Sequence, residues 1–260
     1  MKKKLISILT IVCMMLAVLP TAAFAADVLE GSCGDDISWV LDTSAGTLTV
    51  SGTGAMKDYN YFADVPWAKN RTSIKKIVVN PGVTHIGTCA FNMWAVSGQQ
   101  LTTVELPDTV TSIGKGAFTA CEKLVSCNLP DSITSIGGYA FSYCASLRST
   151  KLPASLTSMG DEVFMDCTGL GDTLEFPAGL TEIPEEAYSG CTGIKRVTLH
   201  DGITSIGNSA FEETSIQKIV IPSSVNTVGS GAFRSCKSLR FVDMKGGTAI
   251  CRFVNDVLHT

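Results

Sequence analysis

Apolar residues recur along this chain at a nearly constant spacing. Three successive segments of 23 residues begin at Leu101, Leu124 and Leu147, and each follows the pattern LxxxxLPxx(V/I/L)TS(I/M)GxxxFxxC. A fixed period of this length predicts a solenoid, in which every repeat forms one turn of a coil. Because a single turn cannot bury its own apolar face, successive turns must stack to make a continuous core.

The same pattern extends on both sides of these three segments. Aligned repeats are 22 to 27 residues apart, which predicts seven full turns and the start of an eighth over residues 74–245. The longest interval is the first, so we expect an outward loop around residues 92–100. The aligned first residues are Ile74, Leu101, Leu124, Leu147, Leu170, Ile194, Ile216 and Leu239.

Each repeat is predicted to contain two short strands, a corner and a turn. In the repeat that starts at residue 101, alternating apolar residues predict a strand over 101–106, which Pro107 ends because proline cannot donate a ladder hydrogen bond. A second extended piece follows over 110–113, and a glycine makes the corner after it. Residues 117–121 predict a single helical turn that closes the coil.

Stacked turns place equivalent residues in columns along the coil, and three columns are distinctive. The aromatic column contains Phe91, Phe118, Phe141, Phe164, Tyr188, Phe211 and Phe233. The glycine column contains Gly87, Gly114, Gly137, Gly160, Pro184, Gly207 and Gly229. The cysteine column contains Cys121, Cys144, Cys167, Cys191 and Cys236.

Residues 26–73 do not follow the period. Segments 37–41 and 47–51 alternate apolar and polar residues on either side of a turn-rich stretch, which predicts a β-hairpin. A solenoid exposes an apolar face at its first turn, so this hairpin is predicted to act as an N-terminal β cap. Trp39 and Trp67 would then pack within the cap instead of forming a ligand platform.

The two ends of the chain carry different signals. Residues 1–25 predict a secretory signal peptide, with lysines at positions 2–4, an apolar run and an Ala-Phe-Ala cleavage site that ends at Ala25. Because the apolar run is shorter than the ~20 residues of a spanning helix, we expect secretion and no transmembrane segment in the mature chain. Residues 246–260 are expected to form a partial cap over the last strand, or a tail within a longer protein.

The repeat pattern, with its Pro, SIG and AFxxC elements, resembles the BspA-type leucine-rich repeat of bacterial surface proteins, and the resemblance covers Ile74–Met244. The segment from Gly31 to Met56 is similar to the cap that precedes such repeats in secreted proteins. The resemblance implies an α/β, mostly β solenoid: a curved, right-handed leucine-rich-repeat coil with short helical turns that binds other macromolecules. Members of this family differ in what they bind, so the resemblance implies no particular ligand. The chain departs from the pattern at Asn80 and His200 in the proline column and at Trp94 and Thr214 in the cysteine column.

The net charge and the motifs of the sequence argue against several classes of function. The formal net charge is −4, and it becomes −7 without the three lysines of residues 1–25, which argues against nucleic acid or an anionic membrane as the main partner. The histidines are His85, His200 and His259, and they are predicted to be solvated loop residues because they share no place in the repeat. No phosphate-binding glycine motif follows a strand. We therefore expect no cofactor and no enzymatic activity.

The cysteine column is predicted to hold buried, inert thiols. Neighbouring strands lie ~4.8 Å apart, which a disulfide can span, and secretion would permit oxidation. Side chains of one column point the same way, however, and cysteine is readily buried as a small apolar residue. No CxxC or Cys/His pair has metal-ligand spacing, so no metal site is expected. Cys33 lies off the column, and the sequence names no partner for it.

Outward positions of the first strand of each repeat form the candidate ligand-binding face. A second candidate is the loop around Trp94, for which a buried tryptophan is an equal alternative because Trp94 takes a cysteine place. The alternative for the face itself is an ordinary solvated sheet. The candidate residues of the face are Lys76, Glu105, Asn128, Lys151, Glu175, Arg196, Lys218 and Phe241.

Taken together, these features predict a secreted bacterial leucine-rich-repeat protein that mediates protein–protein or cell-surface interaction in the manner of an adhesin. Its expected partner is an extracellular protein or another cell-surface macromolecule. The alternative is a structural spacer, or the repeat part of a larger surface protein with no binding activity of its own.

Overall fold

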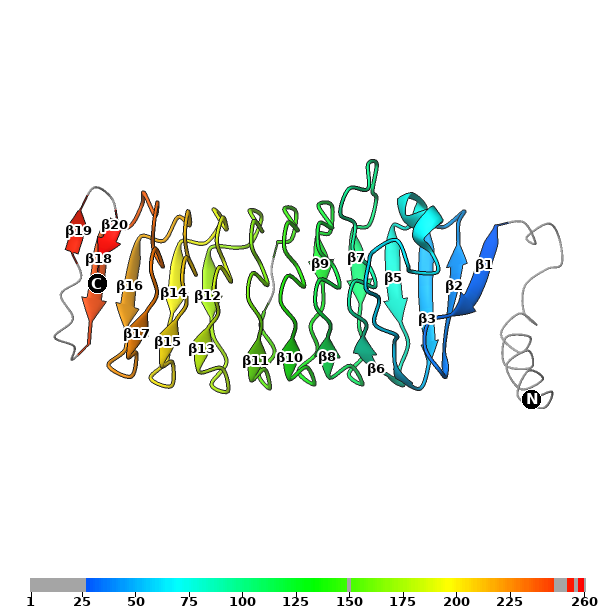
Figure 1. The fold of residues 1–260 in the computed structure, drawn as a ribbon, viewed down its shortest axis with the longest axis horizontal. Helices are drawn as coiled ribbons and strands as arrows, with labels where there is room; N and C mark the ends of the chain where they lie inside the picture. The colour runs from blue at the N-terminus through cyan, green and yellow to red at the C-terminus, as the bar shows by residue number, and fades with distance from the viewer. Residues whose placement is uncertain (1–26, 149–150, 246–251, 255–256, 260) are drawn as a thin grey trace.

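The structure is a computed structural model that describes residues 27–148, 151–245, 252–254 and 257–259. Over these residues the chain forms a mostly β solenoid of about seven turns, which lie side by side in one row (Figure 1). The one helical segment of the described residues is the short 3-10 helix η1, Ala68–Ser73. The predicted signal peptide lies outside the described residues.

The N-terminal part contains three antiparallel strands, β1 (Val28–Ser32), β2 (Ile37–Asp42) and β3 (Thr47–Gly52). The predicted hairpin is the β2–β3 pair, in which Trp39 lies opposite Val50. Strand β3 then pairs in parallel with the first strand of the repeats, so the antiparallel strands are continuous with the solenoid.

Most later turns contribute one short strand to each of two parallel ladders, as predicted. Among the described residues, the turn that starts at Leu147 has a strand in the second ladder only. The strands of the first ladder are β5 (Lys76–Val79), β7 (Thr103–Glu105), β9 (Ser126–Cys127), β12 (Thr173–Glu175), β14 (Arg196–Thr198), β16 (Lys218–Ile221) and β18 (Phe241–Met244). Those of the second are β4 (Gly54–Ala55), β6 (Val83–Ile86), β8 (Ser112–Ile113), β10 (Ser135–Ile136), β11 (Ser158–Met159), β13 (Glu182–Ile183), β15 (Ser205–Ile206) and β17 (Thr227–Val228). Near the C-terminus, β19 (Arg252–Val254) and β20 (Val257–His259) form an antiparallel pair within the segment predicted as a tail or partial cap.

The segments that close each turn are hydrogen-bonded turns, and the predicted helical turns are not observed there. In the repeat that starts at residue 101, the Cys121 N–H donates to the Phe118 carbonyl of the same turn, whereas the Phe118 N–H donates to Ala140 of the next turn. Gly116 and Ala120 have φ values of 61° and 58°. Left-handed residues interrupt a right-handed helix, so the backbone alternates between local and inter-turn bonds.

The predicted aromatic column is confirmed as one continuous stack inside the solenoid. From Phe91 to Phe233, successive rings have centroids 5.2 to 5.9 Å apart and planes within 22° of each other. Trp67 extends the stack at its N-terminal end, 5.4 Å from Phe91, and its indole N–H donates to the Ala90 carbonyl. Trp39 contacts Trp67 edge-on at 5.7 Å, so both tryptophans are buried packing residues and neither forms an exposed platform.

The cysteine column consists of buried, free thiols, as predicted. Each thiol donates to the carbonyl of the aromatic residue in the preceding turn, with Sγ–O distances of 3.0 to 3.3 Å. Burial raises the pKa of Cys144, Cys167 and Cys191 well above the usual value. Cys33 is also free and buried, and desolvation raises its pKa to about 12. These four thiols with a raised pKa are poor nucleophiles because the reactive thiolate is disfavoured.

Candidate functional site

The register of the parallel strands aligns part of the predicted face, so that its side chains form rows across the strands. Thr173, Arg196, Lys218 and Phe241 occupy matching positions on β12, β14, β16 and β18. On the N-terminal side, Lys76 of β5 lies in register with neighbouring strands in the same way. The predicted rows are therefore a consequence of the parallel ladder, in which equivalent outward side chains stand side by side.

Arg196, Lys218 and Phe241 form the row at the C-terminal side. We call it the basic–aromatic row. The Lys218 ammonium lies 4.9 Å from the centroid of the Phe241 ring, and Phe241 is 50% exposed. Arg196 is exposed and forms an ion pair with Asp172 at 3.3 Å. Exposed ion pairs contribute only ~0–1 kcal/mol, so the Arg196 guanidinium can exchange Asp172 for another carboxylate at small cost.

Other predicted face residues have different roles. The Asn128 side-chain amide accepts the Leu106 N–H at 2.9 Å and donates to the Leu106 carbonyl at 2.8 Å, so it extends the backbone ladder. Lys76 and Glu105 form an exposed ion pair at 2.7 Å. Lys151 and Glu175 lie apart from these, on the wall of a surface groove of about 470 Å³.

Trp94 lies on the surface, which excludes the alternative of a buried tryptophan. Its side chain is 48% exposed and meets Tyr143 edge-on, with ring centroids 5.3 Å apart. The Trp94 N–H donates to the Asn92 side chain at 2.8 Å, and Ala95 next to it has a φ of 59°. The loop that carries these residues projects beyond the neighbouring turns beside β7 (Figure 1). Met93, buried beside it, is the residue that faces the core.

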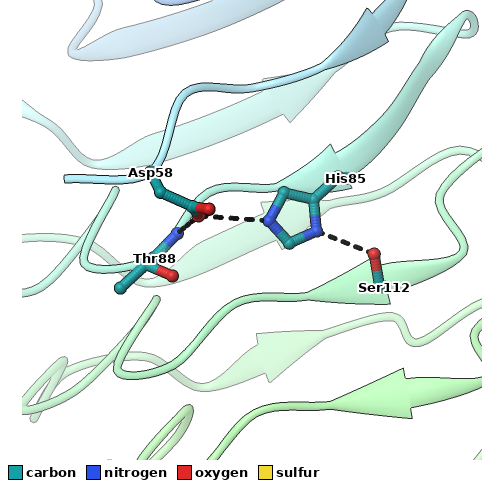
Figure 2. A network of polar contacts seen from close by, with 4 residues as sticks. All are labelled: Asp58, His85, Thr88 and Ser112. Atoms are coloured by element: carbon teal, nitrogen blue, oxygen red, sulfur yellow. Dashed lines mark hydrogen bonds and ion pairs between the residues drawn. The ribbon is translucent and has the colours of Figure 1, made fainter.

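A network of three polar side chains, which the sequence did not indicate, lies over the second ladder (Figure 2). His85 Nδ1 is 2.7 Å from Ser112 Oγ, and His85 Nε2 is 3.3 Å from Asp58 Oδ1. The same Asp58 oxygen accepts the Thr88 N–H at 2.6 Å. His85 belongs to strand β6, so the prediction of a solvated loop histidine is wrong for this residue. His200 differs as well: it is half-buried and contacts the Pro177 carbonyl at 3.1 Å, whereas the His259 side chain lies outside the description.

The chemistry of this network favours a structural role. A Ser–His–Asp arrangement can activate a nucleophile, but acyl transfer also needs a substrate pocket and preorganised oxyanion donors. Ser112 is the ordinary serine of the repeat, aligned on the ladder with Ser135, and the Asp58 side chain is 66% exposed. The two grooves that we describe are lined by later turns. The network ties the segment after β4 to the first two repeats.

This link predicts a small, pH-dependent contribution to stability. The Thr88 N–H, followed by the Thr88 side chain and then His85, lowers the pKa of Asp58. Since the folded-state pKa lies below the unfolded one, the stabilisation is present at neutral pH and is lost as the pH falls below about 4. Asp58→Asn should therefore be less stable than the parent by under ~1 kcal/mol at pH 7, because the site is exposed.

Urea unfolding at a series of pH values measures this difference, with Asp35→Asn, an exposed aspartate of the same N-terminal part, as the control. A gap between parent and Asp58→Asn that stays constant down to acid pH would contradict the role of the Asp58 carboxylate.

Two further observations concern the described residues only. No group of three or more His, Cys, Asp or Glu side chains among them is arranged to hold a metal ion. None of their helices has both the length and the apolar character that crossing a membrane requires.

Solved structures with similar folds are bacterial leucine-rich repeat proteins. A leucine rich cell surface protein from Faecalibacterium prausnitzii is 26% identical, with a TM-score of 0.63, over 88% of this chain and 57% of that chain. A leucine-rich repeat protein from Bacteroides ovatus, 21% identical, has a TM-score of 0.51 over 80% of this chain and 70% of its own. The chain thus spans little more than half of the F. prausnitzii protein. None of the curated proteins matches the sequence.

The family comparison agrees with the repeat pattern and the ladders. Six copies of the BspA type leucine rich repeat region match residues 68–173 and 171–252, which together are more than half of the chain. The match begins at η1, just before the first repeat strand, and extends past the last strand of both parallel ladders. The chain therefore belongs to the BspA-type leucine-rich repeat family.

Proposed function

We propose that this protein is a secreted bacterial, adhesin-like module that binds an extracellular protein or another cell-surface macromolecule, without catalysis. Its family and the cell-surface protein from F. prausnitzii support a protein-interaction role at a bacterial surface. The proposal includes a cleaved signal peptide over residues 1–25, an N-terminal cap over residues 26–73 and a right-handed, curved coil. These three features go beyond the family assignment and are part of the proposal.

The basic–aromatic row carries the proposal for where the partner binds. Binding hot spots are enriched in aromatic residues and arginine that become buried at the centre of an interface. Phe241 offers a half-exposed ring backed by the Lys218 ammonium, and Arg196 stands in the same row. These three side chains fit a partner that presents carboxylates around an apolar centre.

Alanine substitution tests this surface. Phe241→Ala, Lys218→Ala and Arg196→Ala should each weaken binding to the partner, and loss of a hot spot of ~2 kcal/mol would mean about 30-fold. Binding is measured against immobilised extracellular-matrix and bacterial-surface proteins, with each variant checked for unaltered thermal unfolding. Lys123→Ala, an exposed lysine on the turn side, is the control.

Equal binding by the parent and all three variants would refute this row as the binding surface. Failure of the mature protein to bind any member of the panels would instead favour the structural-spacer alternative.

A further inference from the structure

Pro184 takes a place in the glycine column, whose other members leave no room for a side chain against the preceding turn. At Gly207 in the next turn, an added Cβ would lie 2.5 Å from the Glu185 nitrogen. The same corners also use their N–H groups, since Gly160 donates to Ile136 at 2.9 Å and Gly207 donates to Ile183 at 2.8 Å. A proline has a side chain and lacks the N–H, so both conditions fail at this corner.

The second ladder is interrupted at this position. It consists of one sheet that ends at β11 and another that begins at β13, and the separation is visible in Figure 1. In five other repeats the equivalent residue donates to the preceding turn, as Thr157 does to Thr134 and Thr204 does to Thr181. Within the described residues, the Thr181 N–H has no such acceptor. The Thr157 and Met159 carbonyls likewise lack the donors that their equivalents have.

The two turns remain joined on their far side. The Glu162 N–H donates to the Glu185 carbonyl at 2.9 Å, and Phe164 and Tyr188 stack at 5.4 Å. The interruption is therefore a wedge that opens at the strands and is closed at the aromatic column. The solenoid core continues through it.

A surface groove of about 490 Å³ begins at this opening, and we call it the ladder gap. One wall is residues 157–161 and the other is residues 180–185, with a continuation over β15 and β17. Ser158 in the wall is exposed, whereas its equivalents Ser112 and Ser135 in the paired part of the ladder are half-buried. The gap thus exposes strand edges that are paired in the neighbouring turns of the second ladder.

The charge of the ladder gap is one-sided. Asp161, Glu182 and Glu185 are exposed on its walls, and no lysine, arginine or histidine is among the described residues that line it. Beside it, partial burial and then the carboxylates of Glu162 and Glu185 raise the pKa of Glu186. The carboxylates of the ladder gap therefore have no positively charged partner among the described residues that line it.

We propose that the ladder gap binds an extended, basic segment of a partner protein, which lies across the gap and forms backbone hydrogen bonds to the unpaired groups of β11 and β13. Unpaired N–H and C=O groups on facing strand edges are complementary to another backbone in the extended conformation. The three carboxylates select lysine or arginine on that segment by charge complementarity. This site goes beyond the proposed function, since it lies on the other ladder from the basic–aromatic row.

Fluorescently labelled octapeptides of alternating lysine and threonine serve as the probe. The mature protein should bind this peptide, and a peptide with glutamate in place of lysine should bind at least about tenfold more weakly. A third peptide keeps the lysines but carries N-methyl groups on alternate amides, which removes backbone donors without changing charge. It should also bind at least about tenfold more weakly, because backbone hydrogen bonds to the carbonyls of residues 157 and 159 need those donors.

Two protein variants locate the binding. Pro184→Gly restores an N–H and removes the ring, so the ladder should close and the lysine peptide should no longer bind. The combined variant Asp161→Asn, Glu182→Gln and Glu185→Gln keeps every side-chain shape and should bind about tenfold more weakly. Because these three residues are exposed, this variant tests the proposal even if Pro184→Gly fails to fold. Glu105→Gln on the first ladder is the matched control.

Amide hydrogen exchange at Thr181 gives an independent readout. The Thr181 amide should exchange fast in the free protein and slowly with the lysine peptide bound. Equal binding of the N-methylated peptide, or full binding by Pro184→Gly or the combined variant, would overturn the proposal, as would absence of binding by the parent. Protection of Thr181 that rises with protein concentration alone would overturn it in favour of a second copy of this chain. The Arg196, Lys218 and Phe241 variants should bind the peptide normally, which separates this test from that of the proposed function.

Discussion

Replacing Phe141 with alanine is expected to lower the free energy of unfolding by about 3–5 kcal/mol, the usual cost of removing a fully buried aromatic side chain. Phe141 is inaccessible to solvent and stacks at 5.2 Å on Phe118 and at 5.4 Å on Phe164. The substitution leaves a cavity in the middle of the column. Since each turn contacts only its neighbours, that cavity also weakens the coupling between the two halves of the array.

The measurement is urea-induced unfolding followed by far-UV circular dichroism. Phe241→Ala is a matched control, because the same atoms are removed from a side chain that is half-exposed at β18. Surface substitutions usually change stability by under ~0.5 kcal/mol, so this control should unfold close to the parent. Similar losses for the two variants would show that the aromatic column is not the main source of stability.

Replacing Gly137 with alanine should destabilise the protein by about 1–3 kcal/mol or more, although it adds only one methyl group. An added Cβ would lie 2.6 Å from the Lys115 nitrogen and 2.9 Å from the Gly114 carbonyl carbon. These are backbone atoms of the preceding turn, which cannot move aside as a flexible side chain can. The two turns must separate at the corner, and that strains the ladder bond from Gly137 to Ile113.

Gly171→Ala is the control for this prediction. Its added Cβ would meet the Arg148 carbonyl oxygen at 3.3 Å as its nearest neighbour, and Gly171 has no left-handed φ. The control should therefore unfold near the parent in the same urea titration. A Gly137→Ala variant as stable as Gly171→Ala would show that the corner relaxes easily, and that Pro184 alone does not explain the interrupted ladder.

The predicted repeats, hairpin and columns are observed because each depends on a local rule. A period of about 23 residues with alternating apolar positions sets the side chains that point inward, and parallel stacking aligns them. The aromatic stack from Phe91 to Phe233 and the buried thiols follow directly. For Trp94 the sequence allows either an exposed or a buried side chain, because a column position alone does not show whether Met93 or Trp94 faces the core.

The predictions that differ from the structure concern contacts between turns. The closing segments are not helical, because inter-turn hydrogen bonds hold residues such as Ala120 at positive φ. His85 is a strand residue whose partners, Asp58 and Ser112, are each 27 residues away in the sequence. Asn128 supports the backbone of Leu106, although its outward position suggested a ligand-binding role. Nothing in the spacing of these residues distinguishes a solvated side chain from one bonded to the next turn.

The repeat pattern of the sequence is enough to predict the architecture of this protein. Periodicity specifies which side chains are buried, and burial of apolar surface is the dominant favourable term in folding, so the coil and its columns are readable from the pattern. How neighbouring turns contact each other, in contrast, depends on backbone distances that appear only in the folded chain. Pro184 is visible in the sequence as a member of the glycine column, but its effect on the ladder depends on a backbone approach of about 2.5 Å between adjacent corners. That distance is set by the stacked turns together, which is why the ladder gap emerges only in three dimensions.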